Sequence, residues 1–165
     1  LNALEDDNER ARNYAAIVLG RLGEKRAVEP LIVALEDSWR ASTNDSYSRR
    51  VKSISLHIAA EALGRIGDPR AVEALIRVLD ADSDYASTHA AFHALVRIGV
   101  PAVRPLLDAI KRDSWRGHSY LEKHAIQTLL AIREQLPEEQ RNMEGLDRVS
   151  LPEKRAYDRG RELGS

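Results

Sequence analysis

The most regular hydrophobic pattern of the chain lies between Ala59 and Leu79. Its second half carries apolar residues at the spacing of one helix face, at Val72, Leu75, Ile76 and Leu79. That spacing indicates an amphipathic helix packed against a core. Its first half is rich in alanine, which suits a helix packed closely against another. The joining triplet Gly67-Asp68-Pro69 offers a helix-ending residue, an N-cap and a first helical residue. We therefore predict two helices joined by a tight turn.

The same pattern recurs elsewhere in the chain, with losses toward the C-terminus. Six of nine positions are identical between Ala15–Gly23 and Ala59–Gly67, and the helices that follow them match as well. A third copy begins at Ala91, and a fourth keeps only its first helix, Ala125–Ile132. We place the repeats at 8–37, 46–82, 83–112 and 118–133, with 1–7 as the end of an upstream repeat and 134–165 as a charged cap or tail.

The first residues fit the same register. Ala3–Asp6 match Ala34–Asp37, and the sequence does not begin with Met. We therefore expect a fragment or a processed form of a longer array of such units.

Two local features refine this picture. Gly64 lies inside a predicted helix, where it costs about 1 kcal/mol relative to Ala. We therefore expect a close helix crossing at Gly64, and likewise at Gly20. The third unit has Val100 where the second has the cap residue Asp68, so its turn should be less regular.

The units resemble the HEAT-like repeat of the phycobilisome (PBS) lyase type, in which an Ala-rich helix leads through Leu-Gly-Asp to a Val/Leu/Ile helix. Ala59–Leu79 follow that repeat closely, and Ala15–Leu35 follow it almost as closely. The resemblance implies an all-α fold, a right-handed α-α superhelix (α-solenoid) of about three and a half helix pairs with a C-terminal cap or tail. It is specific for a repeat class and implies no particular activity.

Composition narrows the classes of function. The chain has 25 Lys and Arg against 26 Asp and Glu, so no overall positive field favours nucleic acid or an anionic membrane. Cysteine is absent, which removes disulfides, thiolate nucleophiles and Cys-type zinc sites. No stretch has the length and apolarity of a membrane span, and none resembles an export signal. We expect a cytoplasmic protein with no cofactor, and neither nucleic acid nor a membrane as its partner.

The first candidate binding surface is a repeated tetrapeptide, Asp-Ser-Trp-Arg, that follows the second helix of the first and third units. It places Trp39 and Arg40 in one loop and Trp115 and Arg116 in another, on the same edge of the solenoid. Trp and Arg are the residue types most enriched at binding hot spots. The alternative is that each Trp folds back and covers apolar surface of its own repeat.

A second candidate is the Ser/Thr-rich insertion 38–53, which contains Tyr47, Arg49 and Arg50. Its excess of cations suits an acidic partner or a phosphate. The alternative is that Ile54 and residues before it continue the apolar stripe backwards. The next helix would then begin near Ser46 and leave only a short polar loop.

A third candidate is a group of histidines. His57 and His89 occupy the same position in adjacent units, and Glu61 and His93 follow four residues later on the same helix faces. Neighbouring helices should bring these four side chains into one area. His and carboxylate ligands at this spacing can bind zinc or iron, so they are candidate metal ligands. The alternative is a solvated polar face.

The last candidate is the outward side of the second helices, which we expect to form the concave face. Its rows across successive units are Glu29, Glu73 and Arg104, then Val33, Arg77 and Asp108. We expect ion pairs at i,i+4 between Glu73 and Arg77 and between Arg104 and Asp108. A mixed-sign surface suits a folded protein better than DNA, whose phosphates need a continuous basic stripe. A solvated face without a partner is the alternative.

These observations favour a non-catalytic scaffold that binds another protein through its concave face or its Trp-Arg edge. The PBS-lyase resemblance implies an alternative, a bilin lyase-like subunit acting on a tetrapyrrole or on the protein that carries it. A second resemblance is to HEAT-like deoxyhypusine hydroxylases, which bind a di-iron centre through His-Glu dyads. Here His57 and His89 match the dyad histidines, but Ile58 and Ala90 stand where Glu is needed. That departure makes metal-dependent hydroxylation the weaker alternative.

Overall fold

The computed structural model describes residues 1–43, 54–80, 84–113 and 120–141. Every element within these ranges is a helix. The first helices of the repeats, called A helices below, are α1 (Glu9–Leu22), α4 (Leu56–Ile66), α6 (Tyr85–Ile98) and α8 (Tyr120–Gln135). The second helices, called B helices, are α2 (Val28–Thr43), α5 (Val72–Asp80) and α7 (Val103–Asp113).

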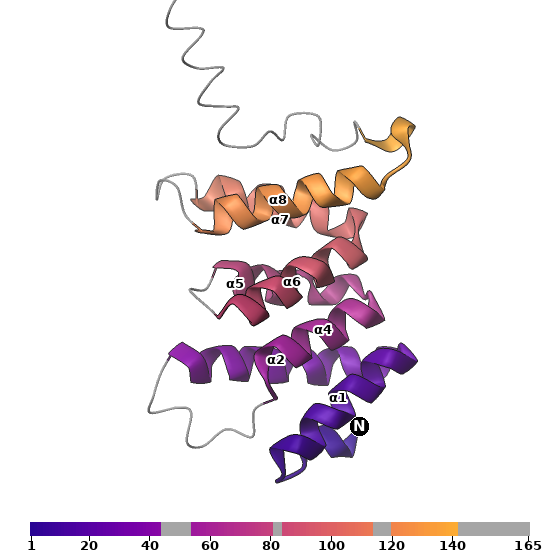
Figure 1. The fold of residues 1–165 in the computed structure, drawn as a ribbon, viewed down its shortest axis with the longest axis vertical. Helices are drawn as coiled ribbons and strands as arrows, with labels where there is room; N and C mark the ends of the chain where they lie inside the picture. Colours follow the sequence, from indigo (N-terminus) through magenta and orange to yellow (C-terminus); the bar gives the residue numbers. More distant parts are fainter. Residues whose placement is uncertain (44–53, 81–83, 114–119, 142–165) are drawn as a thin grey trace, which may run out of the picture.

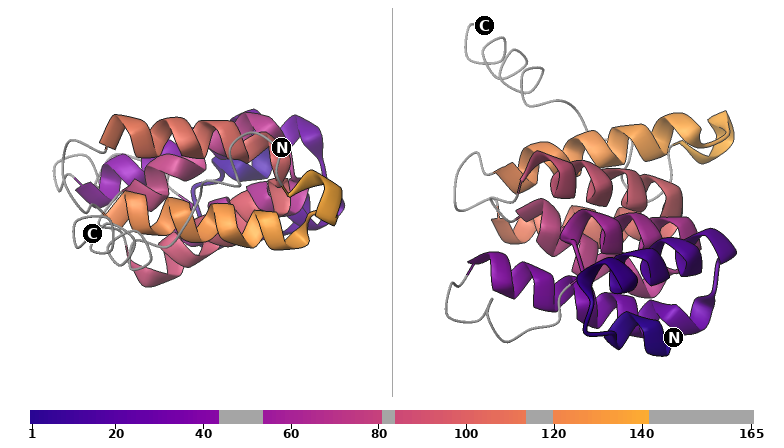
Figure 2. Two further views of the ribbon diagram at one scale, coloured as in Figure 1. Left: turned by 90° about the horizontal axis from the view of Figure 1, so that it is seen from above. Right: turned by 60° about the horizontal axis from the view of Figure 1, so that its bottom comes forward.

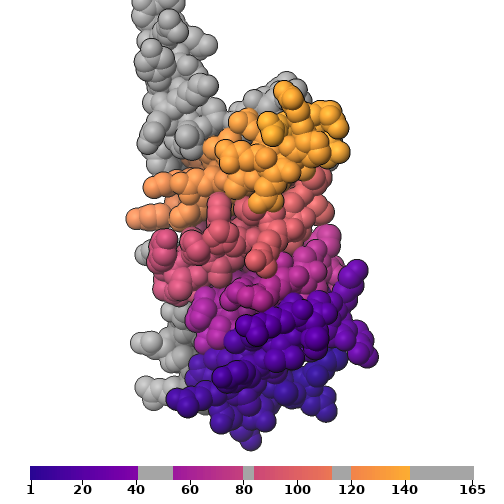
Figure 3. Space-filling model, turned by 45° about the vertical axis from the view of Figure 1, so that its right-hand side comes forward, coloured from indigo at the N-terminus to yellow at the C-terminus, as the bar shows by residue number. Residues whose placement is uncertain are grey.

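The helices are stacked along one axis (Figure 1). Each A helix contacts the next A helix of the chain, from α1 through α4 and α6 to α8, and the B helices α2, α5 and α7 follow one another in the same way. Seen from one end, the A and B helices form two layers (Figure 2). In the space-filling view the repeats form successive bands (Figure 3). The fold is therefore an all-α solenoid, as the repeat pattern predicts.

The turns between paired helices follow the glycine pattern of the sequence. Gly23 (φ 64°, ψ 30°) and Gly67 (φ 70°, ψ 23°) adopt the left-handed conformation that ends a helix. The Asp68 side chain accepts a hydrogen bond from the amide of Arg70 and caps a short 3-10 helix, η3 (Pro69–Ala71), which leads into α5. Gly99 has φ 75° but ψ −133°, and the 3-10 helix after it has no side-chain cap. The less regular third turn is thus confirmed.

Replacing Asp68 with Ala should lower the free energy of unfolding by about 1 kcal/mol, because the cap is lost. Asp68→Asn is the matched control, since Asn caps a helix as well as Asp does but loses the charge. Hydrogen bonds from the side chain and backbone of Arg70 hold the pKa of Asp68 below its usual value. Stability from this carboxylate is therefore present above the unfolded-state pKa and is lost as pH falls. Thermal melts of the variants at neutral and acid pH test both points, and an unchanged D68A melt would contradict the first.

The A helices cross most closely at two glycines. A Cβ atom built on Gly20 would lie 2.8 Å from the Cα of Ala62, and one built on Gly64 would lie 2.5 Å from the Cα of Ala94. Both distances are shorter than nonbonded carbons allow, so only glycine fits. The close crossing expected from the sequence is confirmed at both positions, and it explains why a helix interior holds glycine.

Two predicted helix boundaries are wrong. Helix α2 continues to Thr43, so that Trp39 and Arg40 lie on a helix and not in a loop. Helix α4 begins at Leu56, and Ile54 lies outside it. The helix predicted to continue back toward Ser46 is therefore interrupted at Ile54 and Ser55.

The start of α4 is set by contacts from two earlier helices. The Asn13 side chain of α1 accepts a hydrogen bond from the amide of Ser55 at 2.9 Å and donates one to its hydroxyl at 3.1 Å. The Ser38 hydroxyl of α2 lies within hydrogen-bond distance of the carbonyl oxygen of Ile54. The Ile54 side chain itself is buried. These contacts fix residues 54 and 55 against α1 and α2 in a nonhelical conformation.

The remainder of the insertion, including Tyr47, Arg49 and Arg50, lies outside the described residues. So does most of the predicted cap or tail, beyond the short 3-10 helix Glu138–Gln140. Among the described helices, none alone has the length and apolarity to cross a membrane. The helices Tyr85–Ile98 and Val100–Arg112 reach that threshold only when counted together across a bend of 116°.

Candidate functional site

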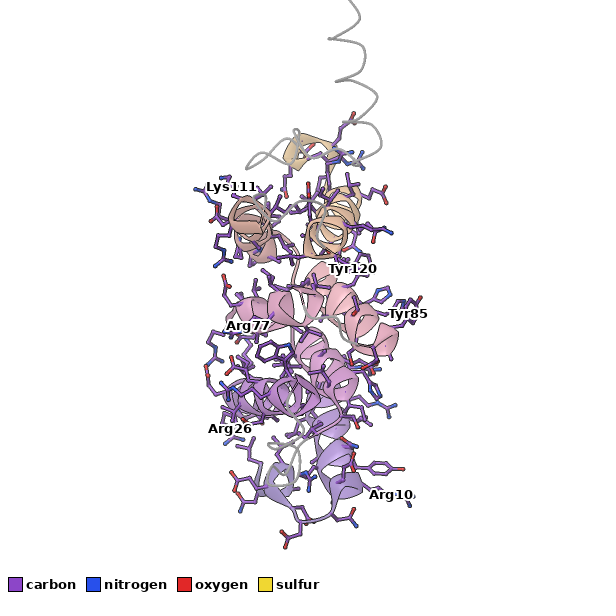
Figure 4. The ribbon with its side chains drawn as sticks, turned by 90° about the vertical axis from the view of Figure 1, so that its left-hand side faces the viewer. Arg10, Arg26, Arg77, Tyr85, Lys111 and Tyr120 are labelled. Atoms are coloured by element: carbon purple, nitrogen blue, oxygen red, sulfur yellow. The ribbon has the colours of Figure 1, made fainter. Side chains whose placement is uncertain are left out.

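The two layers of helices present side chains on opposite faces. In Figure 4, Arg26, Arg77 and Lys111 project on the side of the B helices, whereas Tyr85 and Tyr120 lie on the side of the A helices. The candidate residues of the sequence are divided between these faces. The cationic candidates Arg77 and Arg104 belong to B helices and the histidines to A helices.

Ion pairs connect successive B helices. Arg70, at the start of the second unit's B segment, pairs with Glu29 of α2 at 3.0 Å. Arg77 of α5 pairs with Glu36 of α2. Arg112 of α7 approaches Glu73 of α5 at 3.9 Å. All three pairs link neighbouring repeats across one exposed surface, called the B-helix face below.

The ion pairs expected within single helices are only partly found. Arg104 and Asp108 pair at 3.4 Å, which confirms that prediction. Glu73 and Arg77 instead pair with neighbouring B helices, because the packing of the repeats brings opposite charges as close as one helical turn does. Exposed pairs of this kind contribute about 0–1 kcal/mol each. Their main effect is to orient charged side chains on the B-helix face.

Trp39 serves the packing of its repeat. Its side chain is half-buried and packs against the hydrophobic core. It borders a small recess together with Leu35 of its own helix and Ala74 and Val78 of α5. For Trp39 the structure thus agrees with the alternative interpretation, in which the ring covers apolar surface.

Arg40, which follows Trp39, is exposed and pairs with Glu36 at 3.4 Å and with Asp37 at 3.2 Å. Trp115 and Arg116 lie outside the described residues. A binding role for the repeated Trp-Arg pair therefore stays a prediction.

A cleft of about 570 Å³ lies between α4 and α6, and we call it the histidine cleft. Its lining side chains from α4 are His57 and Glu61, with Gly64 beside them. Those from α6 are Tyr85, Ala86, His89, Ala90, His93, Ala94 and Arg97. The structure thus brings the four histidine-group candidates into one area, as the repeat register predicts.

Contacts inside the cleft bring ring nitrogens close together. The Nε2 atoms of His89 and His93 are 3.1 Å apart, a hydrogen bond in which one imidazole donates and the other accepts. The ring of Tyr85 packs against His89 with centroids 5.6 Å apart. Glu61 accepts a hydrogen bond from the Arg65 guanidinium at 2.7 Å. These contacts arrange the polar groups along the two walls of the cleft.

The metal hypothesis gains no support from this geometry. The described residues contain no group of three or more His, Asp or Glu side chains placed to hold a metal ion. The carboxylate of Glu61 is ion-paired with Arg65. Metal binding by His57, Glu61, His89 and His93 stays a prediction.

Partial burial affects the protonation of one histidine of the cleft. It lowers the pKa of His93 below its usual value, and the charges of His89 and Arg97 lower it further. His93 is therefore neutral at neutral pH and acts as a hydrogen-bonding group. Arg97 supplies a fixed positive charge.

Sequence reasoning missed two residues of the cleft, Tyr85 and Arg97. The signal was present, because Tyr85, His89, His93 and Arg97 recur at intervals of four and so follow one face of α6. Only the two histidines are of a residue type that commonly binds metal ions, so the metal hypothesis included neither Tyr85 nor Arg97.

Comparison with known protein families agrees with the fold. Residues 55–129 match the family model described as HEAT repeats, and residues 11–37 match the model described as a PBS lyase HEAT-like repeat. No curated protein matches the chain. The first match spans α4 to most of α8, and the second spans most of α1 and the first part of α2. Both matches identify the class of repeat. The bilin lyase-like alternative stays a prediction.

Proposed function

Because this chain belongs to the HEAT-like repeat proteins, we propose that it is a non-catalytic scaffold that binds a folded protein across its B-helix face. Repeats of this class serve as scaffolds for protein interaction, since stacked helix pairs expose a large and rigid surface. The proposal concerns which surface is used and what kind of partner fits it.

The observation that carries the proposal is the set of ion pairs between successive B helices. Arg70, Arg77 and Arg112 each pair with a Glu of the neighbouring B helix. Both signs of charge are thereby held at fixed positions over α2, α5 and α7. A complementary mixed-sign surface on a folded protein would match this pattern and gain specificity from it. A polyanion such as DNA would meet a carboxylate beside each of these cations.

The B-helix face is a better binding surface than the Trp-Arg edge. Trp39 is half-buried in the packing between α2 and α5 and offers only part of its ring to a partner. Val33, in contrast, is an apolar residue of α2 with 57% of its surface exposed among the charged rows. An exposed apolar residue inside a charged rim resembles the centre of a protein interface.

Site-specific photo-crosslinking tests the surface directly. A benzophenone amino acid is placed at Val33 on the B-helix face, and in a control protein at Tyr14 of α1, which is 71% exposed. We expect a defined protein adduct from position 33 in an extract of the source cells, and none of the same mass from position 14. Mass spectrometry identifies the adduct. Adducts of equal yield from both positions would contradict a specific B-helix face.

Charge exchange then separates binding from folding. In Arg77→Glu, two carboxylates face each other between α2 and α5, because Arg77 pairs with Glu36. In the double variant Glu36→Arg/Arg77→Glu the pair is restored with its charges exchanged, and Arg40 keeps its contact with Asp37. We expect affinity for the crosslinked partner to fall about tenfold in both variants. Recovery of binding in the double variant would show that Arg77 acts only through packing, and would contradict the proposal.

A further inference from the structure

We propose that the histidine cleft is a second binding site, which takes an extended acidic segment of a partner protein. The cleft lies between the A helices α4 and α6, on the side of the solenoid opposite the B-helix face (Figure 4). The inference does not depend on the function proposed for the B-helix face.

The shape of the cleft follows from the close helix crossing. Its small lining residues are Gly64, Ala86, Ala90 and Ala94. Because these residues carry at most a methyl group, larger side chains on either side stand above them as walls. The wall on α6 runs from Tyr85 to Arg97, more than three helical turns and about 18 Å. A peptide of about five residues in extended form spans that length.

The charges of the cleft favour a carboxylate ligand. The negative charge of Glu61 is compensated by Arg65 on the same helix, 2.7 Å away. Asp84, near His57, accepts hydrogen bonds from the amide and hydroxyl of Ser87 and caps α6. Arg97, in contrast, makes no ion pair with any residue that the structure describes, although it lines the cleft. An exposed guanidinium without a carboxylate is suited to bidentate binding of one from a ligand.

The other walls supply hydrogen bonds and an aromatic surface. An imidazole carries at least one N–H donor in either protonation state, and the contact between His89 and His93 uses only one N–H of the pair. His57 adds a further donor from α4. Tyr85 is 82% exposed at the end of the cleft, opposite to Arg97. Exposed Tyr and Arg are among the residue types that carry most binding energy in protein interfaces.

A peptide fits these groups better than a nucleic acid does. A nucleic acid requires a continuous row of cations along its phosphates. Between Tyr85 and Arg97 the cleft offers a single uncompensated fixed cation, and Glu61 lies on the facing helix. A peptide with one or two carboxylates beside an aromatic residue would complement the cleft. Its carboxylates would bind the guanidinium of Arg97 and the imidazole donors, and its aromatic ring would contact Tyr85.

The experiment uses a fluorescein-labelled Glu-Glu-Phe-Glu-Glu peptide and fluorescence anisotropy at neutral pH with the whole chain. The variant Arg97→Gln removes the cation of the cleft. Arg21→Gln is the matched control, because Arg21 of α1 is exposed, occupies the same repeat position as Arg97 and lies outside the cleft. Circular dichroism verifies that both variants are folded. We expect saturable binding by the unmodified protein, about tenfold weaker binding by Arg97→Gln and unchanged binding by Arg21→Gln.

The comparison peptide Gln-Gln-Phe-Gln-Gln has the same length and aromatic residue without charge, and we expect it not to bind. The proposal is overturned if the acidic peptide does not bind, or if Arg97→Gln binds it as tightly as the unmodified protein. Equal weakening by Arg97→Gln and Arg21→Gln would also overturn it, since attraction would then be nonspecific. So would tighter binding of a short single-stranded oligonucleotide than of the acidic peptide.

Discussion

Gly64→Ala should lower the free energy of unfolding by about 3 kcal/mol, even though Ala favours a helix by about 1 kcal/mol. The added Cβ would lie 2.5 Å from the Cα and 2.6 Å from the Cβ of Ala94. Side-chain rotation cannot move either atom away, because the Cα belongs to the backbone of α6 and the Cβ is bonded directly to it. The helices α4 and α6 must therefore move apart. The expected loss lowers the melting temperature by roughly 6–12 °C, which a thermal melt followed by circular dichroism measures.

Gly23→Ala is the matched control, because it is the same change at a glycine with no neighbouring atom within 4 Å of the new Cβ. Its φ of 64° is unfavourable for Ala, so a cost of about 1 kcal/mol is expected. The difference between the two variants isolates the steric cost of the crossing. If Gly64→Ala were no worse than Gly23→Ala, the close approach of α4 and α6 would not be a feature of the folded protein.

Leu75→Ala should lower the free energy of unfolding by about 3 kcal/mol, since it removes a fully buried side chain and leaves a cavity. Leu75 is 0% exposed. It lies in α5, which contacts α2, α6, α7 and α8. A cavity there weakens the interfaces of the central repeat with both of its neighbours. Because repeats are stable only through such interfaces, the denaturant midpoint of the whole solenoid should fall.

Leu22→Ala provides the comparison for Leu75→Ala. It is the same chemical change at a residue of α1 that is 74% exposed. A change within about 0.5 kcal/mol is expected. Similar midpoints for the two Leu variants would contradict the placement of Leu75 at the core of the stack.

The fold could be predicted from the sequence because its signals are local. Gly67, Asp68 and Pro69 each suit one position of a tight turn, and the structure places them there. The apolar spacing from Val72 to Leu79 describes one buried helix face, and these residues are buried. Gly20 and Gly64 are expensive inside a helix, and that cost pointed to the close crossings that the structure shows.

The features that could not be predicted depend on contacts between distant segments. Helix α2 extends to Thr43, beyond the end of the repeat pattern, where Trp39 packs against the hydrophobic core. Arg77 selects Glu36 of another repeat over Glu73 of its own helix. The histidine positions were identified from the repeat register. The spacing along α6 also places Tyr85 and Arg97 on the face that carries His89 and His93. That this face lines a cleft depends on the packing of α4 against α6, which the repeat pattern does not specify.

The glycine crossings also determine in which order the repeats can follow one another. Gly20 faces Ala62 and Gly64 faces Ala94, whereas the residues at the corresponding positions of the third and fourth units are Val96 and Thr128, both buried. The larger side chains of this last pair require a wider spacing of their helices. If the unit 83–112 were deleted, Gly64 and the close spacing around it would meet the branched Thr128. The third unit therefore presents the small Ala94 to the unit before it and carries the larger Val96 where the earlier units have glycine. The repeats are not interchangeable, despite their common pattern.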